Sequence, residues 1–574
     1  METVDAQRVL VVGNGPVGQT TALLLARWGI PVLLVDRRPA RDAIGSKAIC
    51  QQRDVLDVWA VCGAGEQIAD EGVTWTTART FYRDRELFGY DIADPGLAHF
   101  PPFVNISQTR TEQLLDEQIA GQPLIEVRWG CDVLGLEQDE HEVRLRCGVR
   151  SGRDGTPGDQ TLRAAYVVAC VGAHCDTVHD ALGVGFDGTG FADRFLICDI
   201  RTDLPGWAKE RRFYFDPEWN PGRQVLIHPC PDSTYRIDWQ VPPDFDLAAE
   251  EADGGLDRRI RKVIGEQDYE LVWHSVYRFS SRIVSRMQVG RALLAGDCAH
   301  LVAPFGARGL NAGVADAENA AWKLAFVLHG WGGGGLHGWG GGGLHRRGGG
   351  GLHGRGGGGL LASYHDERHA AARENLDVTT ATMDFLVPQT DAERAHRRDV
   401  LERAGVDAEA RAEVDSGRLS EPFWYAGSPL VTPAAHRPAA VRPERGAAQL
   451  PGPGVIVPDV PIRVAGRATR SRAILRDGFA FLATPGVDPS ALRAARDAGA
   501  DGMPVSVHEL ADIDPDGALA VALDVHPGEL WLVRPDAHVA AVLSDPGPEP
   551  VTAAVRRALG RAPRPADRPL SRRA

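Results

Sequence analysis

The sequence predicts an α/β protein built from a βαβ unit, a β-rich segment inserted after it, and a separate α/β segment near the C-terminus. The βαβ unit covers residues 8–36, where a valine-rich run, a glycine turn, a helical pattern and a second apolar run follow one another. The insertion is indicated by residues 195–290, which carry bulky and β-branched side chains separated by Pro and Gly. After about residue 430, strand-like runs and helical patterns without cysteine indicate the third segment.

Length and charge set the class of protein and its partners. The 574 residues suffice for about three or four ordinary domains. The chain carries 63 Lys and Arg against 77 Asp and Glu, a net charge of −14, so nucleic acid and anionic lipid are not expected partners. Its nine cysteines lie between Cys50 and Cys298 without a CxxC pair, which is typical of reduced thiols. We expect a cytoplasmic protein without a membrane helix that binds small molecules.

The first motif is the glycine turn of the βαβ unit. Gly13 permits a tight turn, Gly15 lets the backbone approach a pyrophosphate, and Gly18 allows close contact between helix and strand. Asp36 ends the second strand, where an acid takes ribose hydroxyls. The pattern predicts a Rossmann-like dinucleotide site, against the alternative of a tight turn that binds nothing. The residues assigned to this site are Gly13, Gly15, Pro16, Val17, Gly18, Asp36 and Arg37.

A second motif runs from Gly290 to Gly313 and reads GRALLAGDCAHLVAPFGARGLNAG. With residues 316–319, it resembles the GD motif and flavin-ring loop of the single-component FAD-dependent aromatic hydroxylases, the group of para-hydroxybenzoate hydroxylase and phenol hydroxylase. Residues 450–565 are similar, more weakly, to the thioredoxin-like tail of phenol hydroxylases. Three further segments are similar to the (3-hydroxyphenyl)propionate and pentachlorophenol hydroxylase branch, namely residues 45–49, residues 194–197 and residues 322–324 with 363–368.

The resemblance implies a monooxygenase that hydroxylates a phenolic or other aromatic substrate. In this chemistry FAD, reduced by NAD(P)H, reacts with O2 to a C4a-hydroperoxide whose distal oxygen attacks the ring. Asp297 would hold the ribityl chain, and the helix after residues 304–311 would stabilise the reduced flavin. The alternatives are that Asp297 caps a helix and that Lys47, Gln108 and Arg110 are merely solvated. The resemblance adds to the cofactor site Lys47, Gln108, Gly296, Asp297, Pro304, Gly306, Gly309, Leu310 and Asn311.

Two features depart from the family pattern. The family has an Asp-Gly pair, used near the pyrophosphate and in nicotinamide binding, where this chain has Val171 and Gly172. This departure leads to the hypothesis that reduction by NAD(P)H is impaired. The second feature is a glycine-rich insertion at residues 331–359, whose composition is that of a flexible linker.

Residues that act on the substrate are harder to assign than those that hold the cofactor. The catalytic candidates are His228, Arg236 and Tyr214, and His300 is a further candidate for proton transfer. The aromatic residues expected to line a substrate pocket are Trp75, Tyr214, Trp219 and Trp239. Core packing is the alternative for the aromatic residues, and a structural role is the alternative for the histidines.

The sequence predicts four parts of the chain and one main function. We expect an FAD-binding domain at 1–185 and 285–376, a β-rich substrate domain at 186–284, a helical segment and linker at 377–449, and a thioredoxin-like domain at 450–565. The partners are an aromatic substrate and O2, with a homodimer left open as the assembly. The alternative functions are a flavin-binding protein with little or no turnover and another flavin oxidoreductase, such as a dehydrogenase, halogenase or epoxidase.

Overall fold

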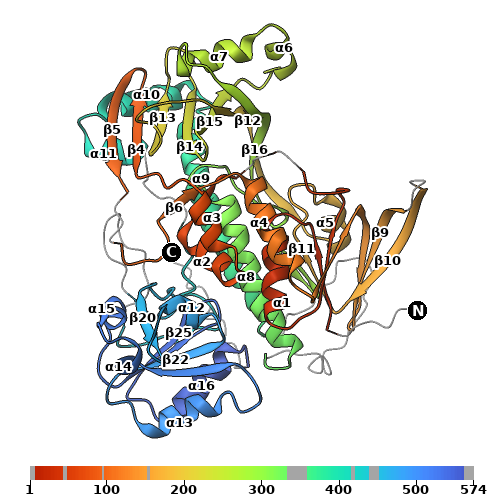
Figure 1. Ribbon diagram of the computed structural model, residues 1–574, viewed down its shortest axis with the longest axis vertical. Helices are drawn as coiled ribbons and strands as arrows, with labels where there is room; N and C mark the ends of the chain where they lie inside the picture. Colours follow the sequence, from red (N-terminus) through yellow and green to blue (C-terminus); the bar gives the residue numbers. More distant parts are fainter. Residues whose placement is uncertain are drawn as a thin grey trace, which may run out of the picture. The chain divides into compact units, whose positions relative to one another are not determined.

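The computed structural model divides the chain into two compact units (Figure 1). It describes residues 7–42, 45, 48–92, 96–151, 156–332, 359–414, 421–437 and 451–561. Unit 1 comprises Met1–Gln138, Glu142–Glu318 and Ala371–Pro422, and unit 2 comprises Asp139–His141, Asn319–Ala370 and Phe423–Ala574. Lys47 and residues 333–358 of the glycine-rich insertion lie outside the described residues. The four predicted domain boundaries stay predictions.

The first sheet of unit 1 is the predicted Rossmann-like sheet. Its order is β17-β18-β11-β1-β2-β7, and all neighbours except β17 and β18 run parallel. The strands β1, β2 and β11 are buried along their whole length, as expected for a sheet covered on both faces. The strands are β1 (Val9–Val12), β2 (Val32–Asp36), β7 (Ile125–Trp129), β11 (Tyr166–Ala169), β17 (Gln288–Val289) and β18 (Ala292–Leu294).

Helices α1 and α4 pack side by side next to this sheet (Figure 1). The helix α1 begins with Pro16, which needs no backbone donor at that position, and ten of its twelve residues are buried. The helices in this part of unit 1 are α1 (Pro16–Arg27), α2 (Arg53–Val61), α3 (Gly65–Glu71), α4 (Gln108–Ala120) and α5 (Asp176–Leu182). Two smaller sheets join them, one of β3 (Cys50–Gln52) with β6 (Phe103–Asn105), the other of β8 (Cys131–Gln138), β9 (Val143–Ser151) and β10 (Thr156–Ala164).

The second large sheet of unit 1 has eight strands in the order β19-β16-β12-β15-β14-β13-β4-β5. It contains the strands predicted for the β-rich insertion and also β4 and β5, which precede that segment in the chain. β4 joins because it pairs in parallel with β13. The strands are β4 (Thr77–Tyr82), β5 (Arg85–Asp91), β12 (Phe186–Arg201), β13 (Glu210–Phe215), β14 (Gln224–Cys230), β15 (Thr234–Val241), β16 (Glu270–Val284) and β19 (His300–Leu301).

Each face of the eight-stranded sheet has its own hydrophobic core. One face packs against α6 (Leu247–Ala252) and α7 (Gly255–Ile264), around Trp239 and Ile237. The other face carries Phe195, Phe213 and Phe215 and packs against helices further along the chain. These helices are α9 (Ala362–Leu386), α10 (Asp391–Arg403) and α11 (Ala408–Val414). One face of the sheet is therefore covered by α6 and α7, and the other by α9, α10 and α11.

Unit 2 contains the C-terminal α/β segment. Its four-stranded sheet has the order β23-β22-β24-β25, with β22 and β23 parallel and the other pairs antiparallel, and its core includes Trp531. Its elements are β20 (Pro461–Val464), β21 (Arg467–Arg470), α12 (Ser471–Leu475), β22 (Phe479–Ala483), α13 (Pro489–Asp497), β23 (Val505–Glu509), α14 (Leu510–Ile513), α15 (Ala518–Leu523), β24 (Glu529–Val533), β25 (Val539–Ser544) and α16 (Pro548–Ala558). The helix α8 (Gly309–Leu328) belongs to this unit from Asn319 onward, and the first residues of α9, up to Ala370, belong to it as well.

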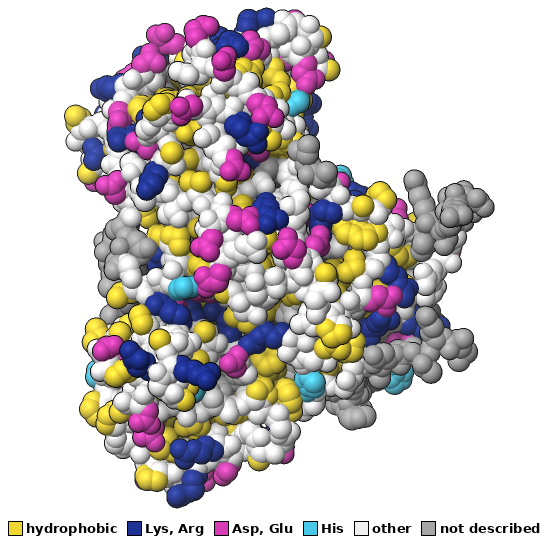
Figure 2. Space-filling model, in the orientation of Figure 1, with side chains coloured by type: hydrophobic (Ala, Val, Ile, Leu, Met, Phe, Trp, Pro, Cys, Tyr) yellow, Lys and Arg dark blue, Asp and Glu magenta, His cyan; other side chains and the backbone are white. Residues whose placement is uncertain are grey.

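Side chains of every kind are mixed on the surface that Figure 2 draws. On the face drawn in Figure 2, acidic and basic side chains are interspersed with hydrophobic ones. Among the described residues, none of the helices is both long enough and apolar enough to span a membrane. The predicted fold class, an α/β protein with a Rossmann-like sheet, a β-rich part and a C-terminal α/β domain, is confirmed.

Candidate cofactor and substrate sites

The glycine turn between β1 and α1 has the geometry that the motif predicts. Gly13 has φ +104°, and a Cβ there would lie 2.2 Å from the carbonyl oxygen of Cys170. A Cβ on Gly18 would lie 1.8 Å from the carbonyl oxygen of Gly13, so a side chain is excluded at both positions. A Cβ on Gly15 would meet nothing within 4 Å. Gly15 therefore faces open space at the start of α1, where the backbone N–H groups of the first turn suit an anion.

Asp36 is buried at the end of β2 and holds the glycine turn in place. Its Oδ2 accepts hydrogen bonds from Asn14 N (2.7 Å) and Arg38 Nη2 (3.0 Å), and its Oδ1 accepts from Arg38 N and Nε. Burial opposes ionisation, but these hydrogen bonds from Arg38 and Asn14 lower the pKa of Asp36 below its ordinary value. All four acceptor positions of the carboxylate are thus occupied. A ribose hydroxyl would have to replace Arg38, which the sequence did not single out, and Arg37 is exposed.

The second motif folds against the first. Gly296 follows β18, and its backbone N–H donates to the buried carboxylate of Asp316 (2.9 Å). A Cβ on Gly296 or on Gly313 would lie 3.1 or 2.6 Å from the side chain of Val17. Residues far apart in the sequence therefore meet at the start of α1. Asp297 lies in the 3-10 turn Gly296–Cys298, and its side chain is exposed.

His300 takes part in fixing this turn. Its Nε2 lies 2.8 Å from Oδ2 of Asp316, and both side chains are buried. Asp316 thus accepts from Gly296 and pairs with His300, a role that the sequence did not reveal although the residue stands in the motif. This arrangement supports the structural alternative for His300 over proton transfer to a substrate.

The loop before α8 combines exposed and strained backbone. Pro304 is exposed, Gly306 has φ +80°, and Ala307 has φ +55°, an unusual conformation for a residue with a side chain. Gly309 begins α8, and Leu310 is half-buried. Asn311 is buried: its Nδ2 donates to Cys50 O and Ala307 O, and its Oδ1 accepts from Gln52 N. Its side chain braces the loop against β3, so any cofactor contact falls to the backbone.

Gln108 and Arg110, which the resemblance places near the cofactor, both lie on α4. Gln108, at the start of α4, accepts from Ala48 N (3.1 Å) and donates to Glu112 (2.9 Å). Arg110 forms a two-point ion pair with Glu71 at 2.6 and 2.8 Å. Both side chains therefore have protein partners in this structure.

The catalytic candidates lie on opposite faces of the eight-stranded sheet. His228 and Arg236 are cross-strand neighbours on one face, and Arg236 is paired with Asp199 at 2.8 and 2.9 Å. Tyr214 pairs across the sheet with Val225, which pairs with Trp239, so these residues share the other face. Tyr214, Trp219 and Trp239 pack in the core around α7, as the core-packing alternative expected. Trp75 stacks on Phe103.

The face of Arg236 carries further polar groups that the sequence did not indicate. Asp238 lies two residues along β15, and its Oδ1 is buried without a hydrogen-bond partner among the described residues. Burial raises the pKa of Asp238 to about 7, although Arg236 and Arg211 oppose this shift. Burial, Arg211 and Arg236 lower the pKa of His228 well below its ordinary value, so this ring is neutral.

The loop before α8 reaches this same face. Phe305 packs against Phe195 and Phe213, with ring centroids 6.0 and 6.3 Å apart. Register places Phe213, Leu226 and Asp238 in one row across the sheet, so Asp238 lies on the sheet face against which Phe305 packs. The cross-strand pair of His228 and Arg236 lies two residues further along the strands, on the same face. The parallel sheet and its glycine turn together define a protein of the dinucleotide-binding class.

Comparison with known proteins identifies the family. Residues 6–338 match the family model of the FAD binding domain, and residues 450–562 match that of the C-terminal domain of aromatic-ring hydroxylases. The chain therefore belongs to the family that carries this FAD binding domain, and both matches are to domains of the FAD-dependent aromatic-ring hydroxylases. The resemblance that the two sequence motifs indicated is confirmed.

Individual relatives agree with this assignment. A 3-(3-hydroxy-phenyl)propionate/3-hydroxycinnamic acid hydroxylase 2 of Burkholderia vietnamiensis is 27% identical over 96% of this chain and 96% of its own length. A 3-(3-hydroxy-phenyl)propionate/3-hydroxycinnamic acid hydroxylase of Mycobacterium avium is 29% identical over 69% of this chain, and the match spans 64% of that protein. The solved structure of the flavin-dependent monooxygenase PieE with FAD and substrate shares the fold, with a TM-score of 0.80, 24% identity, and coverage of 98% of this chain and 100% of that one.

Proposed function

We propose that this flavin monooxygenase hydroxylates a phenolic substrate, with NAD(P)H as reductant and O2 as oxidant. The observation that carries the proposal is the position of Phe305: the loop assigned to the flavin ring packs on the sheet face that bears Asp238. Bound FAD, once reduced, would supply the activation of O2, from which the transferred oxygen atom comes. The protein must hold the phenol beside that loop and take up its proton.

The cofactor is proposed to lie across the two motifs. The open space beside Gly15 and the N–H groups of the first turn of α1 suit the pyrophosphate. The exposed side chain of Asp297 suits the ribityl hydroxyls, and the backbone at Gly306 and Gly309 suits the ring. Asp36 acts through the glycine turn, because its acceptors are already taken by Asn14 and Arg38.

Asp238 is the proposed acceptor of the phenol proton. A general base acts best when its pKa lies near the working pH, and the pKa of about 7 meets that condition. A deprotonated phenol is a more electron-rich ring and is attacked more readily by an electrophilic oxygen. Arg236, fixed by Asp199, then supplies a positive charge two residues away from Asp238 to hold the phenolate oxygen or another acidic group of the substrate.

The neutral His228 completes the proposed polar row. Its Nδ1 is buried without a hydrogen-bond partner among the described residues, so it can bind a substrate hydroxyl at no cost to an existing contact. Together the row offers a base, a cation and a neutral ring nitrogen beside an aromatic wall. These are the groups that a phenol with a second polar substituent requires.

The test is product formation by the purified flavoprotein. Phenols with and without a carboxylate side chain are supplied with NADH or NADPH, and oxidation of the reductant, O2 consumption and incorporation of ¹⁸O from ¹⁸O2 into the ring are measured. The proposal expects substrate-dependent oxidation and one labelled oxygen atom in the product. Bound flavin without any substrate-dependent oxidation would favour the alternative of a flavin-binding protein with little turnover.

A further inference from the structure

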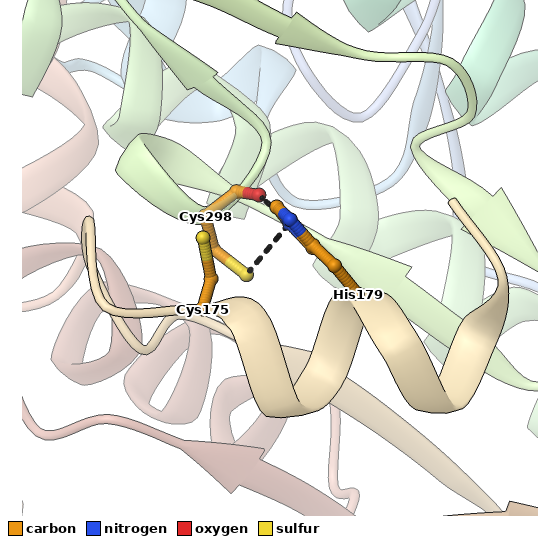
Figure 3. Close-up of side chains that lie close together, drawn as sticks. All are labelled: Cys175, His179 and Cys298. Carbon is orange, nitrogen blue, oxygen red and sulfur yellow. Dashed lines mark hydrogen bonds between the residues drawn. The ribbon is translucent and has the colours of Figure 1, made fainter. Parts of the chain in front are cut away.

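Three side chains that the hydroxylase reaction does not use lie close together beside the 3-10 turn Gly296–Cys298, which we call the GD turn. Cys175, His179 and Cys298 each offer one ligand atom, and these atoms all lie within 4.8 Å of one another (Figure 3). Cys175 precedes α5, His179 lies on α5, and Cys298 ends the 3-10 turn that contains Asp297. Two sequence segments more than a hundred residues apart therefore supply the group.

The three residues are enclosed in unit 1. Their exposed fractions are 1% for Cys175, 5% for His179 and 0% for Cys298. The Sγ of Cys298 lies 4.0 Å from Nε2 of His179, and the Sγ of Cys175 lies 3.5 Å from Ala173 O. Phe186 packs against the His179 ring at 4.9 Å and helps to fix its orientation. The side chains point toward one another in Figure 3.

The chemistry of this group is that of a ligand set for a soft cation. Two thiolates with one imidazole are among the commonest protein ligands of zinc. Both cysteines bind a cation as thiolates, so each gives up its proton when the cation enters.

We propose that Cys175, His179 and Cys298 form a binding site for Zn²⁺, which ties the β11–α5 loop to the GD turn. Zn²⁺ with two thiolates and a neutral imidazole carries no net charge, and this neutrality suits a buried site. Up to two thiol protons are released to solvent on binding, and no electron is transferred. The alternative chemistry of the same pair, a disulfide between Cys175 and Cys298, would need an oxidant.

His179 must change its hydrogen bonding to take part. Its Nε2 lies 2.7 Å from the carbonyl oxygen of Cys298, so this nitrogen carries the hydrogen and donates it. Binding through Nε2 moves that hydrogen to Nδ1 and releases the carbonyl of Cys298. That carbonyl, or a water molecule, is then available as the fourth ligand that tetrahedral zinc requires.

The site lies where zinc can influence the flavin without touching it. Cys298 directly follows Asp297, and Cys175 follows the Val171–Gly172 segment by three residues. Zinc would therefore stiffen both segments that flank the predicted cofactor. The role is that of a structural metal, which links two loops instead of acting on the substrate.

The test uses the FAD-containing protein, reduced with a phosphine and freed of metal. Zn²⁺ is added, excess is removed, and bound zinc is measured by mass spectrometry and by X-ray absorption at the zinc edge. Wild-type protein is compared with the double variant Cys175→Ser/Cys298→Ser, with the single variant Cys175→Ser, and with Cys62→Ser as a matched control outside the cluster. Flavin absorbance and circular dichroism report whether each variant is folded.

We expect about one zinc per chain in wild type and in Cys62→Ser, with two sulfur ligands at about 2.3 Å and nitrogen at about 2.0 Å. The affinity should fall at least about 100-fold in the two cluster variants. A second measurement needs no variant: Zn²⁺ uptake by the reduced wild type should release thiol protons, which a pH indicator in weak buffer detects. Equal zinc binding by the double variant, a zinc spectrum without sulfur, or a reduced wild type that takes up no zinc overturns the proposal.

Discussion

Replacement of Glu367 by Gln should destabilise unit 2 because it removes the central anion of a buried ion cluster. Glu367 is fully buried and accepts hydrogen bonds from Lys323 (2.6 Å), Arg534 (2.6 and 3.0 Å) and Asn319 (2.8 Å). Asp536 is the second anion of the cluster and pairs with Arg534. The charges of Lys323, Arg534, Glu367 and Asp536 cancel, so the Gln variant leaves one buried positive charge uncompensated.

Loss of one partner from a buried ion pair costs about 3–5 kcal/mol. In a unit of this size each kcal/mol shifts the melting temperature by about 2–4 °C, so the transition of unit 2 should fall by about 6–20 °C. Thermal unfolding followed by the fluorescence of the buried Trp322 and Trp531 measures this shift. The exposed Glu549→Gln on α16 is the control and should change the transition little.

A second variant separates loss of charge balance from loss of packing. Glu367→Gln combined with Lys323→Met removes one charge of each sign and should recover part of the stability. Burial also lowers the pKa of Lys323 to about 8, against the attraction of Glu367, so this cation is held at a cost. A Gln variant that melts within about 1 °C of wild type would refute the reasoning, because the buried charge would then have no measurable cost.

Three further predictions concern the cofactor and substrate sites. Asp238 can accept a proton only above its pKa of about 7, so the rate of hydroxylation should rise with pH through this value. In a series of kcat measurements against pH, Asp238→Asn should abolish this rise and slow turnover by about 10²-fold. Val171→Asp restores the acid of the family's Asp-Gly pair and should speed flavin reduction in stopped-flow measurements; an unchanged rate would mean that position 171 does not correspond to that acid. Asp316→Asn weakens the contacts to Gly296 and His300 and should destabilise unit 1 by about 1.5–3 kcal/mol in urea unfolding, whereas unchanged unfolding would contradict the role assigned to Asp316.

The raised pKa of Asp238 also has a consequence for stability. The folded protein keeps this proton up to about pH 7, whereas an unfolded carboxyl loses it near its ordinary value of 3.8. The folded state therefore binds more protons in this window, and the contribution of Asp238 to stability decreases as pH rises from about 4 to 7. In Asp238→Asn, the part of the pH dependence of the free energy of unfolding that comes from Asp238 should be lost. The difference between the two proteins then separates Asp238 from the other carboxyls that titrate.

Sequence motifs predicted those parts of the site whose residues are close together in the sequence. The order of strand, glycine turn, helix, strand and acid fixes the positions of Gly13, Gly18 and Asp36, because each follows from backbone geometry within one βαβ unit. The segment around Gly296 and Asp297 could be predicted for the same reason, because it follows directly after the short buried strand β18.

Roles that depend on pairing between distant strands could not be predicted in the same way. Tyr214 and Arg236 were grouped as candidates, but strand alternation and register place them on opposite faces of the sheet. The hydrogen bonds that Arg38 donates to the Asp36 carboxylate depend on side-chain conformation, which the motif does not encode. The meeting of Cys175 with Cys298 required the fold, since no spacing in the sequence indicates it.

The segments around Gly15 and Asp297 are expected to bind one FAD molecule, and a titration of the flavin-free protein with FAD tests this most directly. Wild-type protein should bind one FAD per chain. Gly15→Glu places a carboxylate in the open space meant for the pyrophosphate, and Asp297→Ala removes the ribityl contact, so each should weaken binding about tenfold or more. Gly15→Ala, whose Cβ meets nothing within 4 Å, should stay folded. Absence of FAD binding in wild type, or unchanged affinity in both Gly15→Glu and Asp297→Ala, would contradict the account.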